Sequence, residues 1–252
     1  MTTWVDSHCH LHLAARGPEE LLARAAAAGV AWLVCPGTDA AGSEHALALA
    51  AAHPGVVFAA AGLHPHDASR WPEEGERIAA LAARAVAVGE CGLDFYRDLS
   101  PREDQVGALR AQFALAEDLG KPLVLHCRDA FSELHDEVES AGVGPRSVLH
   151  CWTGGPRWTQ RFAALGVTFS FAGPLAYPTG DTARRAAAVA PPERTMIETD
   201  TPYLTPPPHR EAPNEPANVV AVGEALAGVW GVAPAEVARL TAETAHRVFR
   251  GD

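Results

Sequence analysis

The chain has 252 residues, 48% of them hydrophobic, and its formal net charge is −11 at pH 7. This length and composition provide for one large core, and barrels of about 250 residues commonly form one domain, so we expect a single domain over residues 1–252. The acidic balance argues against a protein that holds nucleic acid through a broad basic surface, because that mode of binding requires many Lys and Arg contacts to phosphate.

The N-terminal segment and the cysteines indicate the compartment. Residues 1–6 lack the basic and apolar regions of a signal sequence, and no later apolar run approaches the roughly 18 residues that a membrane helix needs. We therefore expect a cytoplasmic protein with no membrane association and no obligate protein partner. The five cysteines are odd in number and lack CxxC spacing, which argues against a disulfide framework and against a structural zinc site.

Short apolar runs alternate with Ala-rich segments along the chain, and loops of a few residues join them. The predicted strands are Trp4–His10, Ala31–Gly37, Val56–His64, Ala85–Gly92, Pro122–Arg128, Ser147–Trp152, Val167–Gly173 and Arg194–Asp200. The predicted helices include Pro18–Ala28, Glu44–Ala52, Pro72–Arg84, Pro101–Leu119 and Ala130–Ala141, several of which have a Gly just past their ends. After the last strand, Glu215–Val229 and Pro234–Phe249 are expected to form two further helices that close the bottom or side of the fold.

Near-continuous hydrophobic strands that alternate with helices indicate a parallel sheet covered by helices. Eight such repeats favour an α/β fold of the (β/α)8 TIM barrel type. An open doubly wound sheet stays an alternative, although no strand-to-helix turn carries the GxGxxG or P-loop spacing that would favour it.

Potential metal ligands end five of the predicted strands, on the side of a barrel where catalytic groups converge. Any one of them alone is better explained as a packed histidine or a turn carboxylate. Together they would form an uncompensated cluster of buried polar groups unless a cation lay among them. We therefore expect two divalent ions, with Mg, Mn and Zn as candidates and Glu90 as the bridge. The predicted ligands are His8, His10, Glu90, His126, His150 and Asp200.

Four cysteines directly follow a His or Glu of this set. Because successive side chains of a strand point to opposite faces, we expect them to pack outward against the helices as small hydrophobes. They are Cys9, Cys91, Cys127 and Cys151.

Six stretches in order resemble the TatD family of metal-dependent deoxyribonucleases, within the amidohydrolase-like barrels, over nearly the whole chain. They are Asp6–Leu11, Gly62–His66, Val88–Tyr96, Leu125–Arg128, His150–Gly154 and Glu198–Leu204. The resemblance implies that His8, His10 and Asp200 hold one metal, that His126 and His150 hold the other, and that Glu90 bridges them. This chain has Trp152-Thr153-Gly154 where the family usually has aromatic-Ser-Gly, which affects substrate contacts near Trp152.

The only lysine separates this chain from other binuclear relatives. Many amidohydrolase-like enzymes bridge their metals with a carboxylated lysine at the end of strand four, whereas Glu90 occupies that place here. Lys121 precedes the predicted fifth strand and therefore lies at the opposite end of the barrel. A lysine-bridged amidase or lactonase is disfavoured.

For the mechanism, we hypothesise that the ions acidify a water that attacks a phosphodiester, with Asp200 accepting its proton beside the bridging Glu90. Arg128 is a candidate phosphate clamp, with a salt bridge to Glu90 or Asp94 as the alternative. His64 is a candidate donor to a phosphate or to the leaving group, with a loop-anchoring role as the alternative.

Two further groups of residues are assigned from their position next to the ligands. Tyr96, Trp152 and Tyr203 are candidates for stacking on bases, with simple packing as the alternative. Asp6 and Glu198 each lie two residues before a ligand, so we expect them to orient imidazoles or to hold Arg128.

Three functions follow from this site. The first is a deoxyribonuclease of the 3′–5′ exonuclease type acting on DNA, single-stranded or at 3′ ends, because a pocket inside a barrel mouth admits a strand end more readily than a duplex interior. The second is a metal-dependent esterase or amidohydrolase, such as a D-aminoacyl-tRNA deacylase. The third is a binding protein that has lost catalysis, which the intact ligand set argues against.

Overall fold

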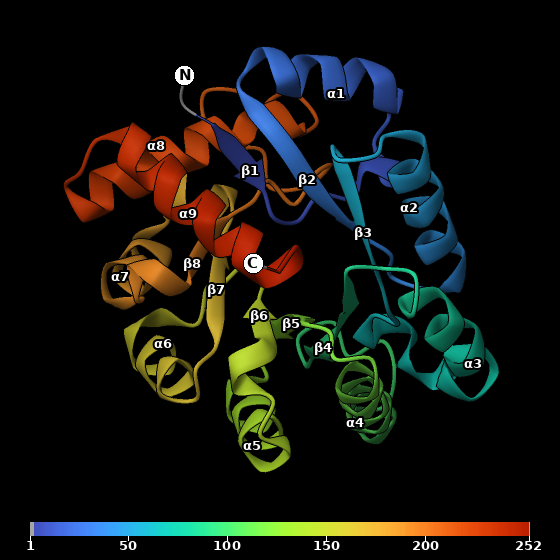
Figure 1. Cartoon of the computed structure of the whole chain (residues 1–252). Coiled ribbons are helices and arrows are strands. Elements are labelled where there is room, and N and C mark those ends of the chain that lie inside the picture. The colour runs from blue at the N-terminus through green and yellow to red at the C-terminus, as the bar shows by residue number, and fades with distance from the viewer. Residues whose placement is uncertain (1–2, 252) are drawn as a thin grey trace.

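The computed structural model describes residues 3–251, in which eight parallel strands form one sheet and alternate with helices (Figure 1). The strands are β1 Trp4–Asp6, β2 Val30–Pro36, β3 Val57–Ala61, β4 Ala87–Asp94, β5 Leu123–Arg128, β6 Ser147–Leu149, β7 Thr168–Phe171 and β8 Thr195–Ile197. The α-helices are α1 Pro18–Ala27, α2 Ala40–Ala52, α3 Trp71–Ala82, α4 Arg102–Asp118, α5 Phe131–Ala141, α6 Gly155–Ala164, α7 Asp181–Val189, α8 Val219–Trp230 and α9 Pro234–Phe249. Short 3-10 helices are η1 Leu11–Leu13, η2 Pro65–Arg70, η3 Gly144–Arg146, η4 Gly173–Ala176, η5 Pro192–Arg194 and η6 Pro216–Asn218.

The sheet runs from β1 to β8 in sequence order, and its two outer strands meet. Just past the ends of both strands, Ser7 N donates to Ile197 O at 3.0 Å and Asp200 N donates to His8 O at 2.9 Å. These bonds close the sheet into a barrel, so the predicted (β/α)8 fold is confirmed and the open doubly wound alternative is wrong.

Helix α9 closes the N-terminal end of the barrel. Inward-facing side chains such as Val5, Val124 and Met196 form a buried cluster with Ala245 and Phe249 of α9. In Figure 1, α9 accordingly lies across the middle of the barrel. This confirms the expected role of the last helix, and the opposite, C-terminal end of the strands is open for a site.

Several strands end at positions that differ from the predicted ones. Strand β1 stops at Asp6, so His8 and His10 lie on the loop that follows, and β8 stops at Ile197, before Asp200. Strand β4 instead continues past the predicted end to Asp94. Asp200 has a φ of 57° and lies outside the extended region, so the predicted eighth strand cannot continue through it. Helix α2 begins earlier than predicted because Asp39 caps it, accepting from Gly42 N at 2.7 Å.

Among residues 3–251, no single helix is both long enough and apolar enough to cross a membrane. Only the segments Pro216–Trp230 and Pro234–Phe249 taken together reach that length and composition, across a bend of 108°.

Candidate metal centre at the mouth of the barrel

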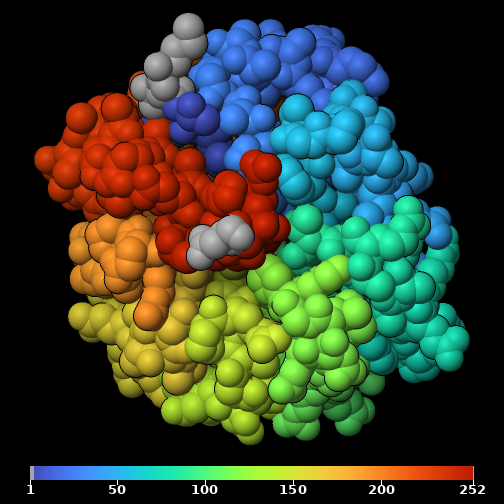
Figure 2. All heavy atoms as spheres, viewed as in Figure 1, coloured from blue at the N-terminus to red at the C-terminus, as the bar shows by residue number. Residues whose placement is uncertain are grey.

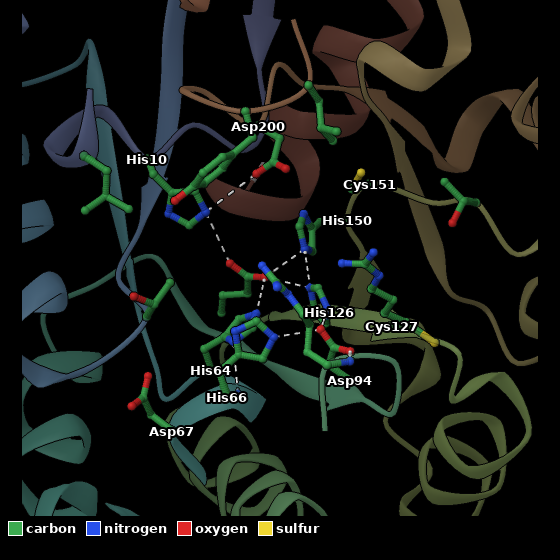
Figure 3. A pocket seen from close by; sticks show the side chains of 18 of the residues that line it. His10, His64, His66, Asp67, Asp94, His126, Cys127, His150, Cys151 and Asp200 are labelled. Atoms are coloured by element: carbon green, nitrogen blue, oxygen red, sulfur yellow. Dashed lines mark hydrogen bonds and ion pairs between the residues drawn. The ribbon is translucent and has the colours of Figure 1, made fainter. Parts of the chain in front are cut away.

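A cavity of about 680 Å³ opens at the C-terminal ends of the strands (Figure 3). Its walls include five of the six predicted ligands; the sixth, His8, lies immediately beneath, with its Nε2 3.1 Å from that of His10. All six side chains are buried or partly buried. Groups that are far apart in the sequence therefore meet in one pocket.

The first cluster consists of His8, His10, Asp200 and one oxygen of Glu90. The two Nε2 atoms lie 3.1 Å apart, and Glu90 Oε2 is 3.4 Å from each of them. Asp200 Oδ1 lies 3.8 Å from His8 Nε2 and 3.6 Å from His10 Nε2. When His10 Nδ1 donates to Pro36 O, 3.1 Å away, its Nε2 presents a lone pair to this cluster. The cluster therefore brings together two imidazole nitrogens and two carboxylate oxygens, a set of ligand atoms suited to a cation.

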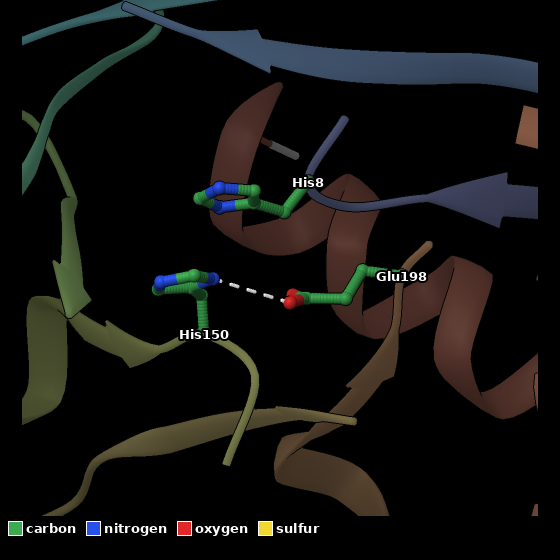
Figure 4. A group of neighbouring side chains, drawn as sticks. All are labelled: His8, His150 and Glu198. Carbon is green, nitrogen blue, oxygen red and sulfur yellow. Dashed lines mark hydrogen bonds and ion pairs between the residues drawn. The ribbon is translucent and has the colours of Figure 1, made fainter. Parts of the chain in front are cut away.

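The second cluster consists of His126, His150 and the other oxygen of Glu90. Glu90 Oε1 lies 2.8 Å from His150 Nε2 and 3.1 Å from His126 Nδ1, and these two nitrogens are 3.2 Å apart. His150 Nδ1 donates to Glu198 Oε1 at 3.2 Å (Figure 4), so its Nε2 needs a proton or a metal ion to face Glu90. Burial alone would lower the pKa of His150, but the adjacent Glu90 raises it well above its usual value. Positive charge at this position, from a proton or from a metal ion, is therefore favourable.

His64 also points at the second cluster. Its Nε2 lies 3.4 Å from Glu90 Oε1, and its ring is 4.6 Å from that of His126. Burial lowers the pKa of His64 to about 4, so the imidazole is neutral at pH 7 and is able to donate one hydrogen bond into the cavity.

Glycines place Glu90 between the two clusters. A Cβ on Gly92, whose φ is 144°, would lie 2.0 Å from His126 O, so only glycine allows β4 to run this close to β5. Gly89 has a φ of 139° and approaches Val124 O in the same way. The register between β4 and β5 shifts between Val88 and Cys91, and this irregularity aims the Glu90 side chain into the mouth.

Asp200 and Glu90 are both buried, but the imidazoles around them give the two carboxylates different proton affinities. Burial raises the pKa of Asp200 to about 7, although His150 and His10 oppose the shift. Burial would also raise the pKa of Glu90, but the surrounding imidazoles, His150 first, hold that pKa well below its usual value. Glu90 therefore stays ionised, whereas Asp200 is able to exchange a proton near neutral pH.

The residues expected to support the ligands behave differently from each other. Glu198 contacts His150 as expected, and it also accepts from Cys151 N at 2.8 Å. Among residues 3–251, Asp6 hydrogen-bonds to neither an imidazole nor Arg128, although it accepts from the backbone N–H of His8 at 3.3 Å. It accepts from Thr199 N at 2.9 Å and from Thr199 Oγ1 at 2.6 Å, so it fixes the backbone before Asp200. The expectation that Asp6 orients an imidazole is therefore wrong, because its carboxylate is turned toward the β8 side.

Comparisons with known proteins agree with this site. The model of the family described as TatD related DNase matches residues 5–250. The chain is 37% identical over 241 residues to the 3′-5′ ssDNA/RNA exonuclease TatD of Pectobacterium parmentieri, covering 92% of this chain and 93% of that protein. It is 33% identical over 251 residues to the uncharacterized metal-dependent hydrolase YabD of Bacillus subtilis, covering 97% and 98% of the two chains. The crystal structure of YJJV, a TatD homologue from Escherichia coli K12, superimposes with a TM-score of 0.91 at 28% identity, covering 98% and 97%.

The chain belongs to the TatD-related DNase family. It is a metal-dependent hydrolase that acts on phosphodiester bonds, and its buried His, Asp and Glu clusters could hold metal ions. The relatives carry nuclease and hydrolase names, so the deacylase alternative is not favoured.

At the rim of this TatD-type mouth, Arg128 stacks on Tyr96. The guanidinium lies 4.0 Å from the centre of the Tyr96 ring, which is 62% exposed. Within residues 3–251, Arg128 forms no ion pair with Glu90 or Asp94, so the salt-bridge alternative is wrong and the guanidinium faces the cavity. Tyr203, 54% exposed, lies on another part of the rim beside His10.

Trp152 does not belong to this rim. Its indole is only 2% exposed, donates from Nε1 to Thr159 Oγ1 at 2.7 Å, and packs against Phe131 and Phe162. The expectation that Trp152 stacks on a base is therefore wrong. Of Trp152, Thr153 and Gly154, the residue that lines the mouth is Thr153, which is also where this chain departs from the family pattern.

The four cysteines that follow the predicted ligands differ in whether they face the core or the mouth. Cys9 and Cys91 are buried in the core between sheet and helices, and Cys127 is partly buried against it although it also borders the cavity at the mouth. Cys151 lines the mouth because its φ of 45° turns it out of the strand pattern, so the expectation of outward packing is wrong for this residue.

Sequence reasoning missed the role of Asp94 and the residues that hold it. Asp94 Oδ2 is 2.7 Å from His66 Nε2 and 3.4 Å from His126 Nε2. On α4, the buried Gln105 pairs with the Asp94 backbone, and the buried Gln112 pairs with the Leu63 backbone next to His64. The sequence carries no signal for this support, because the burial that forces the two amides to find partners is visible only in the fold.

Proposed function

We propose that this chain is a 3′–5′ exonuclease that removes nucleotides from single-stranded DNA with two divalent ions. The observation that carries the proposal is the position of Glu90: its two oxygens face two separate pairs of imidazoles at the floor of one pocket. His8, His10 and Asp200 would hold one ion, and His126 and His150 would hold the other. The donor set of imidazoles and carboxylates is compatible with Mn, Zn or Mg.

Bound divalent ions would polarise the phosphodiester and lower the pKa of water from about 15.7 toward about 7. The chain's own groups then complete the reaction. Asp200, which would lie beside the ion that it helps to hold, accepts the proton of the attacking water. His64 donates from the cavity wall to a phosphate oxygen, and Arg128 binds the adjacent phosphate.

The shape and charge of the mouth select a strand end. The ligands lie at the floor of a cavity of about 680 Å³, which a duplex interior cannot enter. Tyr96 and Tyr203 are exposed on the rim, where stacking tolerates any base. The net charge of −11 disfavours an extended footprint on nucleic acid and is compatible with a contact limited to the last nucleotides.

The test uses single-stranded DNA labelled at its 5′ end, with Mn²⁺ or Mg²⁺ added to the full chain. We expect products that shorten stepwise from the 3′ end, no digestion of circular single-stranded DNA, and no turnover by His126→Ala. Asp67→Asn serves as the matched control, because Asp67 lines the same cavity and its carboxylate, within residues 3–251, pairs with Arg70 and with no candidate ligand. Cleavage of circular strands would contradict exonuclease action, and turnover confined to D-aminoacyl-tRNA or model esters would overturn the nuclease assignment.

The cytoplasmic location and the lack of an obligate protein partner stay predictions from the sequence.

A further inference from the structure

A second cavity, of about 610 Å³, lies at the opposite end of the barrel from the metal centre. It is formed where β5, β6 and β7 begin, beside α9 and η5. Figure 2 shows this face, with α9 in red next to the green and yellow segments that precede those strands. Four basic residues and one acidic residue line the cavity: Lys121, Arg146, Arg194, Arg247 and Glu193.

These four basic residues have no carboxylate partner among residues 3–251. Several arginines elsewhere on the surface pair with acids, as Arg110 does with Glu137 at 2.7 Å and Arg77 with Glu44 at 2.6 Å. In this cavity, Arg247 instead contacts the backbone carbonyl of Glu193, while the Glu193 carboxylate stays exposed. A chain of net charge −11 therefore concentrates unpaired positive charge at one place.

The C-terminal ends of three helices offset part of this positive charge. Lys121 Nζ donates to three carbonyls at the end of α3, at 2.5 to 2.8 Å. Arg146 donates to Ala116 O at 3.3 Å near the end of α4, and Arg194 donates to Ala163 O at 3.1 Å near the end of α6. A helix C-terminus carries roughly −0.5 charge, so three of them and Glu193 together offset about 2.5 of the four positive charges. An excess of about 1.5 positive charges remains.

Two arginines of the cavity also keep unused hydrogen-bond donors. A guanidinium has five N–H donors, and each of Arg146 and Arg194 uses one in the contacts above. Pro122, Pro145 and Val148 provide apolar wall beside these groups. The volume lies within the range of roughly 300–1,000 Å³ typical of small-molecule sites.

We propose that this cavity binds a phosphate group, either free or carried by a small phosphomonoester. A phosphomonoester carries about −1.5 to −2 charge at pH 7, which matches the excess, and its oxygens fit guanidinium donors in pairs. This site is separate from the metal centre, so the proposal does not depend on the nuclease assignment.

Isothermal titration with inorganic phosphate and with deoxyadenosine 5′-monophosphate tests the proposal, in the full chain stripped of metal ions by EDTA so that neither probe binds to cations at the other end of the barrel. We expect Arg247→Gln to weaken binding at least tenfold, and His126→Ala to leave it within twofold, because His126 lies at the other end of the barrel. Arg239→Gln is the matched control: it removes the same charge from the same helix, where Arg239 is paired with Glu236 and Glu243.

Arg146→Gln is expected to act like Arg247→Gln. Arg146→Gln also removes the contact with the end of α4, and this loss could prevent folding. In that case Arg247→Gln still tests the proposal, because Arg247 is exposed and its guanidinium, within residues 3–251, hydrogen-bonds to Glu193 and Thr244 alone. Equal affinity for the two probes identifies free phosphate as the ligand, and tighter binding of the nucleotide identifies a phosphomonoester. Unchanged affinity in Arg247→Gln, binding lost in His126→Ala, or no binding of either probe at millimolar concentration would overturn the proposal.

Discussion

Replacing Glu198 with Gln tests whether His150 is held in the tautomer that binds metal. Glu198 Oε1 accepts from His150 Nδ1 at 3.2 Å and from Cys151 N at 2.8 Å, while its Oε2 is buried with no hydrogen-bond partner. Gln keeps both bonds only by turning its carbonyl oxygen toward them, which leaves its NH₂ group in the place of Oε2. The negative charge that makes the imidazole a stronger ligand is then lost.

The expected magnitude follows from this contact. Removing such a partner of a metal-bound histidine typically costs 10–100-fold in metal affinity, or about 1.4–2.7 kcal/mol. We therefore expect the half-saturating Mn²⁺ concentration for hydrolysis of single-stranded DNA to rise by about 10–100-fold in Glu198→Gln. Turnover at saturating Mn²⁺ should recover to within about threefold of the original chain, because the ligands themselves are intact.

The assay measures hydrolysis across a Mn²⁺ series, with Glu193→Gln as a control that removes an equal charge at the far end of the barrel. An unchanged half-saturating concentration in Glu198→Gln would refute the orienting role. Turnover that stays low at saturating Mn²⁺ would show that Glu198 acts on a step other than metal binding.

Asp200→Asn should lower turnover by about 10²–10⁴-fold while circular dichroism shows an intact fold, and near-normal activity would remove Asp200 from proton transfer. Gly92→Ala should destabilise the fold by at least about 2 kcal/mol, a fall in Tm of about 4–8 °C, because its Cβ would meet His126 O at 2.0 Å. Gly107→Ala on the exposed face of α4 should instead stabilise by about 0.5–1 kcal/mol, and equal Tm values for the two variants would show that the β4–β5 approach is not tight. Trp152→Ala should destabilise the fold by about 3–5 kcal/mol. Tyr203→Ala should leave Tm unchanged and weaken binding of single-stranded DNA by about 1–3 kcal/mol. The reverse pattern would place Trp152 on the substrate path.

The barrel could be predicted because local and global signals agree. Each strand is an apolar run, each helix is rich in helix formers, and the loops are short, so the order of elements leaves few topologies. The ends of strands were harder to predict. The sequence from Trp4 to His10 looks continuous, but β1 ends at Asp6 and the backbone of His10 has left the extended region.

The meeting of the six candidate ligands in one pocket could be predicted from the sequence, although the backbone that brings two of them together could not. A strand from Trp4 to His10 would place His8 and His10 on one side by alternation, yet both lie on a loop and still bring their Nε2 atoms within 3.1 Å. The positive φ of Asp200 and Cys151 could not be read from the residues, since φ values of this kind are set by the surrounding structure. Cys151 consequently faces the mouth, contrary to expectation.

Roles that depend on side-chain direction could not be predicted at all. The sequence places Trp152 beside a ligand but does not show that its indole turns into the core toward Phe162. The support of Asp94 by Gln105 arises between β4 and α4, and no spacing in the sequence relates the two.

The presence and separation of two ions test the central claim most directly. A crystal structure of the full chain grown with Mn²⁺, with anomalous scattering measured at the manganese edge, should show two peaks about 3.5–4 Å apart with one Glu90 oxygen on each. A single peak, or two peaks of which only one contacts Glu90, would contradict the two-ion account.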